Sequence, residues 1–388
     1  MTSKQSGISS PVADRPYEWI DTPRGLERLA GELSKQERIG LDTESDSFHH
    51  YRERVCLIQI STRDHDTIID PLALRDLSLL RPLFQDPNRE WVMNGADYDI
   101  VCLKRDFDIH FARIFDTVVA AQLLGYRATG LAAMLKLHFQ VNVSKTFQRD
   151  EWFRRPLTPG QIDYALNDTR YLLPLRKILM DKLVEMKRLS WAEEEFAQVS
   201  RRVWTREPFS PEDFWRIRGS RDLPAREQII LRELAVMRDN RARAANRPPF
   251  KIISDAALLA IARAKPRNES AVARVKGISP LMMRRLGADI LEAVRAGSHA
   301  GEDSLPPVQR GERRRHDPGV GARLEALKEW RRKKAAALQL DPGVLCPLSY
   351  LQSVARANPR SVAEIEGIED VSRWRIREFG QEWIQALA

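Results

Sequence analysis

A motif that occurs twice in the second half of the chain limits its possible folds most strongly. Residues 262–267 read Ala-Arg-Ala-Lys-Pro-Arg, and residues 355–360 read Ala-Arg-Ala-Asn-Pro-Arg. A second pair, residues 275–278 and 365–368, follows in the same order at nearly the same separation, and a basic helical pattern precedes each copy. Because such self-similarity marks a repeated structural unit, we predict two copies of one helical bundle, each of about seventy residues.

The first half of the chain has a different apolar pattern. Short runs dense in Ile, Leu or Val indicate strands at residues 38–42, 55–61, 67–70 and 91–93. Helical patterns alternate with them, at residues 77–84, 97–106, 116–124 and 131–137. A further helix should begin at Thr158, a candidate N-cap followed by Pro159, and Pro174 should kink or split it. This alternation predicts an α/β domain with a mixed sheet.

These patterns divide the chain into six expected segments. They are a disordered start at 1–13, an α/β domain at 14–200, a connector at 201–220, a first helical domain at 221–297, a linker at 298–320 and a second helical domain at 321–388. The linker is rich in Gly, Pro and charge, as connecting segments commonly are.

Charge is distributed unevenly between the two halves. Residues 1–200 carry 27 Lys and Arg against 30 Asp and Glu, a difference of −3, whereas residues 201–388 carry 36 against 24, a difference of +12. A mildly acidic half joined to a basic half suggests a carboxylate-rich site attached to domains that attract a polyanion. Solvated helix faces would give the same totals, so composition leaves both interpretations open.

The three cysteines and the hydropathy pattern indicate a protein of the reducing cytoplasm. Cys56, Cys102 and Cys346 lie far apart in apolar surroundings, so their spacing suits neither a disulfide framework nor a zinc site. No stretch approaches the ~18 consecutive apolar residues of a membrane span, and the first fifteen residues lack the pattern of a signal peptide. Nothing resembles a dimerising heptad pattern, so we expect a monomer.

Asp42 and Glu44 lie two residues apart at the end of an apolar predicted strand. Because side chains alternate along a strand, both carboxylates should project from one face. Paired carboxylates beside an apolar strand are costly unless a cation binds them, and hard divalent ions such as Mg²⁺ prefer oxygen ligands. The alternative is a strand that simply ends in solvent.

Two further segments carry acidic residues at suggestive positions. Tyr164 and Asp168 are four residues apart on a predicted helix, so they should share one face, where the phenol could orient a water molecule. The alternative is a solvated helix face, since such pairs occur by chance on many exposed helices. Asp97 and Asp99 follow a glycine turn at a helix start, where either could act as an N-cap or first-turn residue. Spacing alone does not decide which of the latter two faces the strand carboxylates.

Together these three segments resemble the DEDD family of 3′–5′ exonucleases in the form with a tyrosine, specifically ribonuclease D and its eukaryotic exosome relatives. The family pattern has Asp-x-Glu on the first strand, an Asp on a helix after a central strand, and Tyr-x-x-x-Asp on a late helix, in this order. The family register selects Asp99 over Asp97, because the aspartate lies five residues beyond a position that here holds Asn94. Relatives usually carry His at that position, so Asn94 is a departure.

The resemblance extends over nearly the whole chain. Residues 55–59, residues 115–117 and Trp152 followed by residues 155–157 also match in order and spacing. The repeats resemble the HRDC domain that RecQ-type helicases and ribonuclease D share at their C-termini. The resemblance thus implies a ribonuclease H-like exonuclease domain with a mixed sheet, followed by two all-α HRDC-like domains.

The resemblance also implies a mechanism, namely metal-dependent hydrolysis with two divalent ions, Mg²⁺ or Mn²⁺, about 3.5–4 Å apart at the scissile phosphate. It assigns Asp42 to both ions, Glu44 and Asp168 to the ion that activates water, Asp99 to the second ion, and Tyr164 to orienting the nucleophile. The expected products are nucleoside 5′-monophosphates released from a free RNA 3′ end, such as that of a tRNA precursor.

Substrate contacts are expected outside the acidic cluster. Lys145, Arg149 and Arg155 are interleaved with Trp152 just before the last motif, and they could guide a single strand by charge and stacking. Gln59, in the matching second strand, joins this set of nucleic-acid-binding candidates. The alternative is a surface loop whose aromatic residues pack inward.

Two other functions remain open from the sequence. A DNA 3′–5′ exonuclease of the same superfamily would use the same residues, because the catalytic set does not itself sense the 2′-hydroxyl. A nucleic-acid-binding adaptor could have lost activity and kept its helical repeats, although the complete set of five catalytic candidates argues against this.

Overall fold

The computed structural model describes residues 15–205, 208–301, 303, 305, 317, 319–369 and 371–388. The disordered start expected at 1–13 and most of the linker expected at 298–320 lie outside the described residues. Contacts divide the chain into two compact units, one of residues 1–45, 55–204 and 315–388, the other of residues 46–54 and 205–314. Each unit is described by itself below.

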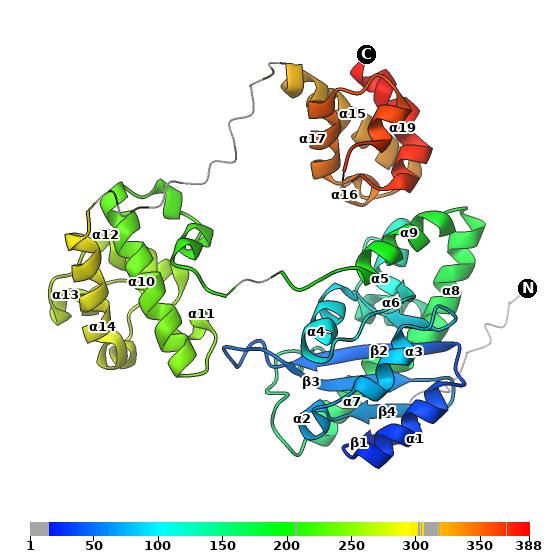
Figure 1. Ribbon diagram of the computed structural model, residues 1–388, viewed down its shortest axis with the longest axis horizontal. Helices are drawn as coiled ribbons and strands as arrows, with labels where there is room; N and C mark the ends of the chain where they lie inside the picture. Colours follow the sequence, from blue (N-terminus) through cyan, green and yellow to red (C-terminus); the bar gives the residue numbers. More distant parts are fainter. Residues whose placement is uncertain are drawn as a thin grey trace, which may run out of the picture. The chain divides into compact units, whose positions relative to one another are not determined.

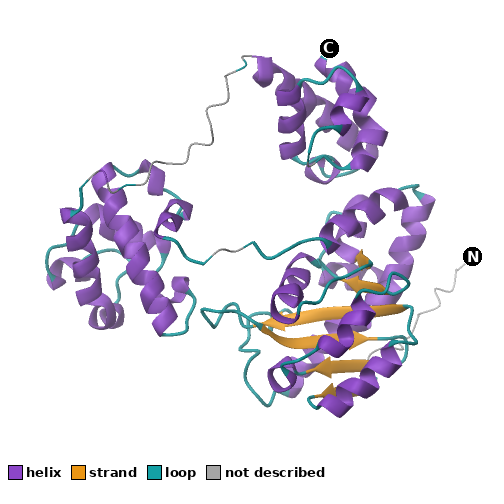
Figure 2. Ribbon diagram, viewed as in Figure 1, coloured by secondary structure: helices purple, strands orange, loops and turns teal. Residues whose placement is uncertain are grey.

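A six-stranded sheet forms the centre of the first unit (Figure 2). Its strands are β1 (Tyr17–Ile20), β2 (Arg38–Ser45), β3 (Val55–Ser61), β4 (Asp66–Ile69), β5 (Glu90–Met93) and β6 (Ile114–Asp116), in the spatial order β1-β4-β3-β2-β5-β6. Strand β3 runs antiparallel to β2 and β4, while β1 pairs parallel with β4, and β5 pairs parallel with β2 and β6. The prediction of an α/β domain with a mixed sheet is therefore confirmed.

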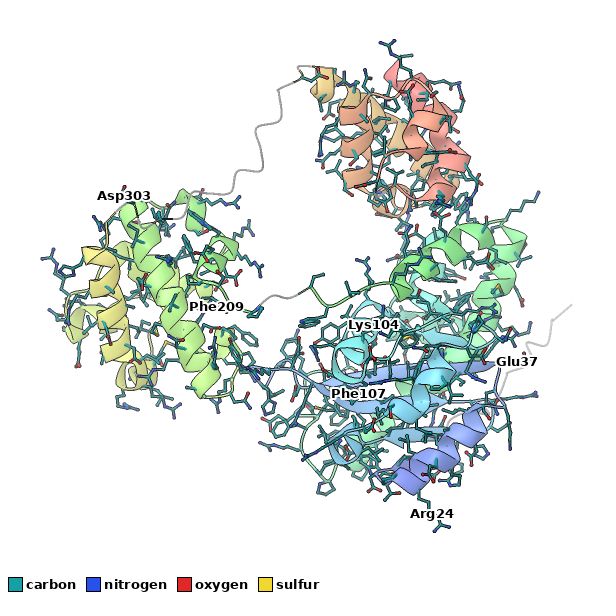
Figure 3. The ribbon with its side chains drawn as sticks, in the orientation of Figure 1. Arg24, Glu37, Lys104, Phe107, Phe209 and Asp303 are labelled. Carbon is teal, nitrogen blue, oxygen red and sulfur yellow. The ribbon has the colours of Figure 1, made fainter. Side chains whose placement is uncertain are left out.

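Helices surround this sheet (Figure 1). They are α1 (Pro23–Leu33), α2 (Pro71–Leu74), α3 (Arg81–Phe84), α4 (Asp97–Phe107), α5 (Thr117–Leu123), α6 (Leu131–Phe139), α7 (Pro159–Arg170), α8 (Leu172–Glu185) and α9 (Leu189–Ser200), with a 3-10 turn η1 (Ser78–Leu80). Helix α4 is fixed by Lys104, labelled in Figure 3, whose ammonium group donates to the Ser200 and Arg202 carbonyls at 2.7 and 2.6 Å.

Prolines explain two boundaries in this domain. The prediction of a single helix at 77–84 is wrong, because the segment divides into η1 and α3. Pro82 has no N–H to donate to a preceding carbonyl, so a continuous helix cannot pass through it. The predicted kink or split near Pro174 is confirmed, since α7 ends at Arg170 and α8 starts at Leu172. Pro174 then lies in the first turn of α8, where its missing donor costs nothing.

The second unit is a helical domain with its own core. Its elements are η2 (Pro211–Arg216), η3 (Ser220–Asp222), α10 (Ala225–Ala244), α11 (Pro249–Ile252), α12 (Asp255–Ala264), α13 (Glu269–Ala273) and α14 (Pro280–His299). Phe214 and Ile217, in the segment expected as a connector, are buried in this core. Residues 46–54 belong to the same unit, where the Tyr51 hydroxyl donates to the buried Asp239 carboxylate at 2.6 Å.

The second helical domain repeats the order of the first. Its helices are α15 (Gly319–Leu338), α16 (Pro342–Leu345), α17 (Leu348–Ala357), α18 (Val362–Glu366) and α19 (Arg373–Leu387). The repeated motif ends α12 and α17 in the same way, with left-handed C-caps at Lys265 (φ 47°) and Asn358 (φ 48°), each followed by a proline. The predicted pair of helical bundles is therefore confirmed.

Helix α19 packs against α9 within the first unit. The rings of Trp191 and Trp374 stack with centroids 4.5 Å apart, and the buried Arg375 guanidinium bonds the Glu195 carboxylate and the Leu345 carbonyl. The three cysteines are buried and form no disulfide among the described residues. Within the described ranges, no helix is long and apolar enough to cross a membrane.

Candidate active site

Gly40 allows helix α7 to lie close to strand β2. A Cβ atom at Gly40 would lie 3.1 Å from the Thr169 carbonyl oxygen of α7 and 3.5 Å from Leu172 of α8. Asp42 and Glu44 follow Gly40 at the two next positions on the same face, because side chains alternate along the strand. The close approach of α7 therefore brings Asp168, the neighbour of Thr169, to the two strand carboxylates.

Three carboxylates meet at this approach. One oxygen each of Asp42, Glu44 and Asp168 lies within 4.8 Å of the others, and among the residues that the structure describes this is the one group with metal-binding geometry. The Glu44 side chain is only 9% exposed. An all-oxygen cluster of this kind has the ligand chemistry that Mg²⁺ and Mn²⁺ prefer.

Asp99, and not Asp97, faces this cluster. Strand β5 pairs with β2 only over residues 38–40, so Asp42, Thr43 and Glu44 lie beyond the segment that β5 covers. Asp99 is 8% exposed and accepts a hydrogen bond from the Thr43 hydroxyl. The Asp97 side chain is 61% exposed and forms an ion pair with Arg202 at 2.9 Å. The role of Thr43 in holding Asp99 was not predicted from the sequence. The one indication of that role in the sequence is the position of Thr43 between Asp42 and Glu44.

Burial and mutual repulsion make these carboxylates strong proton acceptors. Burial, followed by the charges of Asp99, Asp168 and Glu44, raises the pKa of Asp42 well above its usual value. Burial also raises the pKa of Glu44, that of Asp99 to about 6 and that of Asp168 to about 7. Such a cluster is costly when fully ionised, and a bound divalent cation would remove that cost.

Tyr164 lies one turn before Asp168 on α7 and is held by two aromatic rings. The Trp152 and Phe147 ring centroids lie 5.9 and 6.1 Å from that of Tyr164. Burial, followed by the nearby carboxylates Asp168, Glu44 and Asp42, raises the pKa of Tyr164, so its hydroxyl keeps its proton and can act as a donor. A hydrogen bond between this phenol and Asp168 lowers the pKa of Asp168 and opposes the effect of burial.

The five residues expected to contact nucleic acid have different environments. Lys145 and Arg149 are exposed. Trp152 and Gln59 are each 0% exposed, so neither presents a surface to a base. Arg155 donates to both Asp70 carboxylate oxygens at 2.6 and 2.8 Å and to the Cys56 carbonyl at 2.8 Å. For Trp152 and Arg155, the geometry favours the inward-packing alternative.

The chain is similar to known nucleases over most of its length. Residues 17–184 match the family model of a 3′–5′ exonuclease, and residues 227–294 and 320–387 each match the HRDC domain. Ribonuclease D of Desulfotalea psychrophila is 31% identical over 338 residues, which cover 86% of this chain and 89% of that protein. The chain belongs to the ribonuclease D family. Its fold class, activity and substrate class follow from this membership.

A solved ribonuclease D has the same architecture. The crystal structure of Escherichia coli RNase D, described as an exoribonuclease involved in structured RNA processing, matches with a TM-score of 0.71 and 25% identity, covering 96% of this chain and 98% of that one. The exosome complex exonuclease RRP6 of Saccharomyces cerevisiae is 31% identical over 265 residues, although the chain spans only 36% of that protein.

Membership of the ribonuclease D family decides between the functions that the sequence left open. The chain is a 3′–5′ exoribonuclease, a hydrolase that acts on RNA, and the exonuclease superfamily to which it belongs is metal-dependent. The expectation of a ribonuclease D-like enzyme with two HRDC domains is confirmed.

Proposed function

We propose that Asp42, Glu44, Asp99 and Asp168 hold two divalent ions, Mg²⁺ or Mn²⁺, and that the enzyme releases nucleoside 5′-monophosphates from a free RNA 3′ end. The observation that carries this proposal is the cluster in which oxygens of Asp42, Glu44 and Asp168 lie within 4.8 Å of one another. Asp99, buried beside it and bonded to Thr43, completes the four carboxylates.

The side chains divide the work of hydrolysis. Bound divalent ions would polarise the scissile phosphate and lower the pKa of the attacking water. Asp42 is the ligand best situated to serve both ions, since the charges of Asp99 on α4, Asp168 on α7 and Glu44 on its own strand all act on it. Tyr164, kept protonated by burial and its acidic neighbours, orients the water through its hydroxyl.

The substrate that best suits the chain is structured RNA with a free 3′ end, such as a tRNA precursor. The half of the chain that contains both helical domains carries 36 Lys and Arg against 24 Asp and Glu, a difference of +12. Such an excess holds an RNA body by phosphate contacts without reading its sequence. We expect a monomer in the cytoplasm, where reducing conditions suit three cysteines that form no disulfide.

The decisive experiment analyses the products of a 5′-labelled, 3′-extended RNA by mass spectrometry, with Mg²⁺ or Mn²⁺ and with EDTA. Stepwise loss of 5′-monophosphates from the 3′ end, abolished by EDTA, is the expected result. Product release that continues in EDTA, or oligonucleotide products, would overturn the proposal. Parallel digestion of a matched DNA strand measures the preference for RNA, and faster loss of DNA would contradict the RNA assignment.

Two aspartates provide matched variants. Asp42→Asn removes one carboxylate from the cluster and should lower the rate by about a hundredfold to a thousandfold or more, because charge aimed at the reacting group contributes this much. Asp97→Asn is the control, since this aspartate lies near the same site but points outward to Arg202. Binding of RNA by the Asp42→Asn protein should stay intact. Equal rates in the two variants would contradict the assignment of Asp42.

A further inference from the structure

Gln59 lies directly opposite Asp42 in the antiparallel pair of β3 and β2. Directly opposite residues project from the same face with Cβ atoms about 4.5–5.5 Å apart, so the Gln59 amide is within reach of the Asp42 carboxylate. Gln59 is 0% exposed, and neither its Oε1 nor its Nε2 has a hydrogen-bond partner among the described residues. A buried amide with both polar ends unsatisfied is destabilising, so packing does not account for it.

The neighbours of Gln59 on the same face of β3 show what packing alone requires. Leu57 belongs to the apolar cluster beneath α7 together with Leu166. The Ser61 hydroxyl donates to Asp66 at 2.7 Å and lies 2.7 Å from the Thr169 hydroxyl. One neighbour is therefore apolar and the other is fully bonded. Gln59, between them, carries the unused hydrogen-bonding capacity, and the residue directly opposite it in the strand pair is Asp42, a carboxylate of the acidic cluster.

We propose that Gln59 is a positioning residue for the metal site: on metal binding its Nε2, which has no hydrogen-bond partner among the described residues, turns to donate to the Asp42 carboxylate and holds it in the orientation that binds a divalent ion. This inference rests on the proposed function of Asp42 as a metal ligand. Hydrogen bonds from outer groups fix the orientation of ligating carboxylates, and their loss commonly weakens metal binding by about 10–100-fold. Gln59 thereby acts through Asp42 and does not touch the RNA.

The test replaces the amide with an apolar side chain of the same length, Gln59→Met, in the full chain. Binding of Mn²⁺ alone is measured by isothermal titration calorimetry without RNA, and thermal unfolding is measured in EDTA. We expect Mn²⁺ binding to weaken by about 10–100-fold while the melting temperature stays equal or rises, because an unsatisfied buried amide is removed. This combination separates a positioning role from a structural one.

Ser61→Ala is the matched control on the same face of the same strand. It removes the contacts to Asp66 and Thr169, so its melting temperature should fall while its affinity for Mn²⁺ stays near that of the wild type. Wild-type Mn²⁺ affinity in Gln59→Met would overturn the inference, as would a loss of affinity that accompanies a loss of melting temperature.

Asp42→Asn distinguishes the failure of this inference from the failure of the proposed function. If the wild type binds Mn²⁺, Asp42→Asn does not, and Gln59→Met binds like the wild type, then Gln59 has no role and the metal site stands. If the wild type and Asp42→Asn give the same titration, the proposed metal site is wrong and the inference fails with it.

Discussion

The Thr43 hydroxyl donates a hydrogen bond to the Asp99 carboxylate, and this contact joins strand β2 to helix α4 at the candidate active site. Thr43 lies between Asp42 and Glu44 in the sequence but projects from the other side of the strand. Three consecutive residues of β2 thus supply two carboxylates and fix a third one. The bond favours the ionised form of Asp99, because it lowers a pKa that burial raises.

Thr43→Val should therefore weaken catalysis without changing the carboxylates. Loss of the hydrogen bond leaves burial unopposed, so the pKa of Asp99 rises above its present value of about 6. The acid limb of the pH–rate profile should move to higher pH, and the rate at neutral pH should fall by about tenfold or more. Thr43→Ser keeps the hydroxyl and should behave like the wild type. An unchanged profile in Thr43→Val would show that the contact has no catalytic effect.

The stability of the metal-free protein should decrease as the pH rises. The pKa of Asp168 is about 7 in the folded protein, against 3.8 for an unperturbed aspartate. At a pH between these two values, the folded form therefore keeps a proton on Asp168 that the unfolded form has lost. A state that holds more protons is favoured at low pH, and its advantage is lost as the pH rises from about 4 to about 7. Melting temperatures in EDTA at pH 5 and pH 8 measure this effect.

Two comparisons isolate the cause of this pH dependence. Mg²⁺ should restore the stability that is lost at pH 8, because a bound cation favours the ionised carboxylates. Asp168→Asn should reduce the difference between pH 5 and pH 8, since the amide does not titrate. A melting temperature that rises with pH in EDTA would contradict the shift in the pKa of Asp168.

Local patterns predicted which side chains share one face, and the family resemblance assigned them to a metal site. Asp42 with Glu44 and Tyr164 with Asp168 share one face by the period of their own element, so no tertiary information was needed. Asp97 and Asp99 both lie in the first turn of α4, and which of them is buried depends on how that helix meets β2. Family register, and not spacing, selected Asp99.

Other features depend on partners far away in the sequence. Trp152 looked like a stacking residue because its neighbours are basic, yet its ring packs against Tyr164 and lies in the core. Arg155 pairs with Asp70, 85 positions earlier. Strands β1 and β6 have four and three residues, too short for a clear alternation, and they are strands because β4 and β5 pair with them. Sequence patterns contain no direct record of such pairings.

Arg155 should contribute to stability more than to RNA binding. Its guanidinium bridges Asp70, which is 5% exposed, and the Cys56 carbonyl, so Arg155→Ala leaves a buried carboxylate without its cation. We expect a loss of about 2–3 kcal/mol in the free energy of unfolding, measured by urea denaturation. Lys145→Ala is the comparison, because Lys145 is exposed and should change RNA affinity with little effect on stability. The reverse result would return Arg155 to the RNA-binding set.

Glu195 should hold the second helical domain against helix α9. Its carboxylate bonds the Arg375 guanidinium, which is 3% exposed, and accepts from the Trp374 indole at 2.7 Å. Glu195→Ala leaves that guanidinium buried without its acidic partner, which commonly costs about 3–5 kcal/mol. Urea denaturation followed by Trp fluorescence should therefore give a lower midpoint, or two transitions where the wild type has one. Glu193→Ala is the control, because Glu193 is exposed on the same helix. If both variants unfold at the wild-type midpoint, the contact between α9 and α19 contributes nothing to stability.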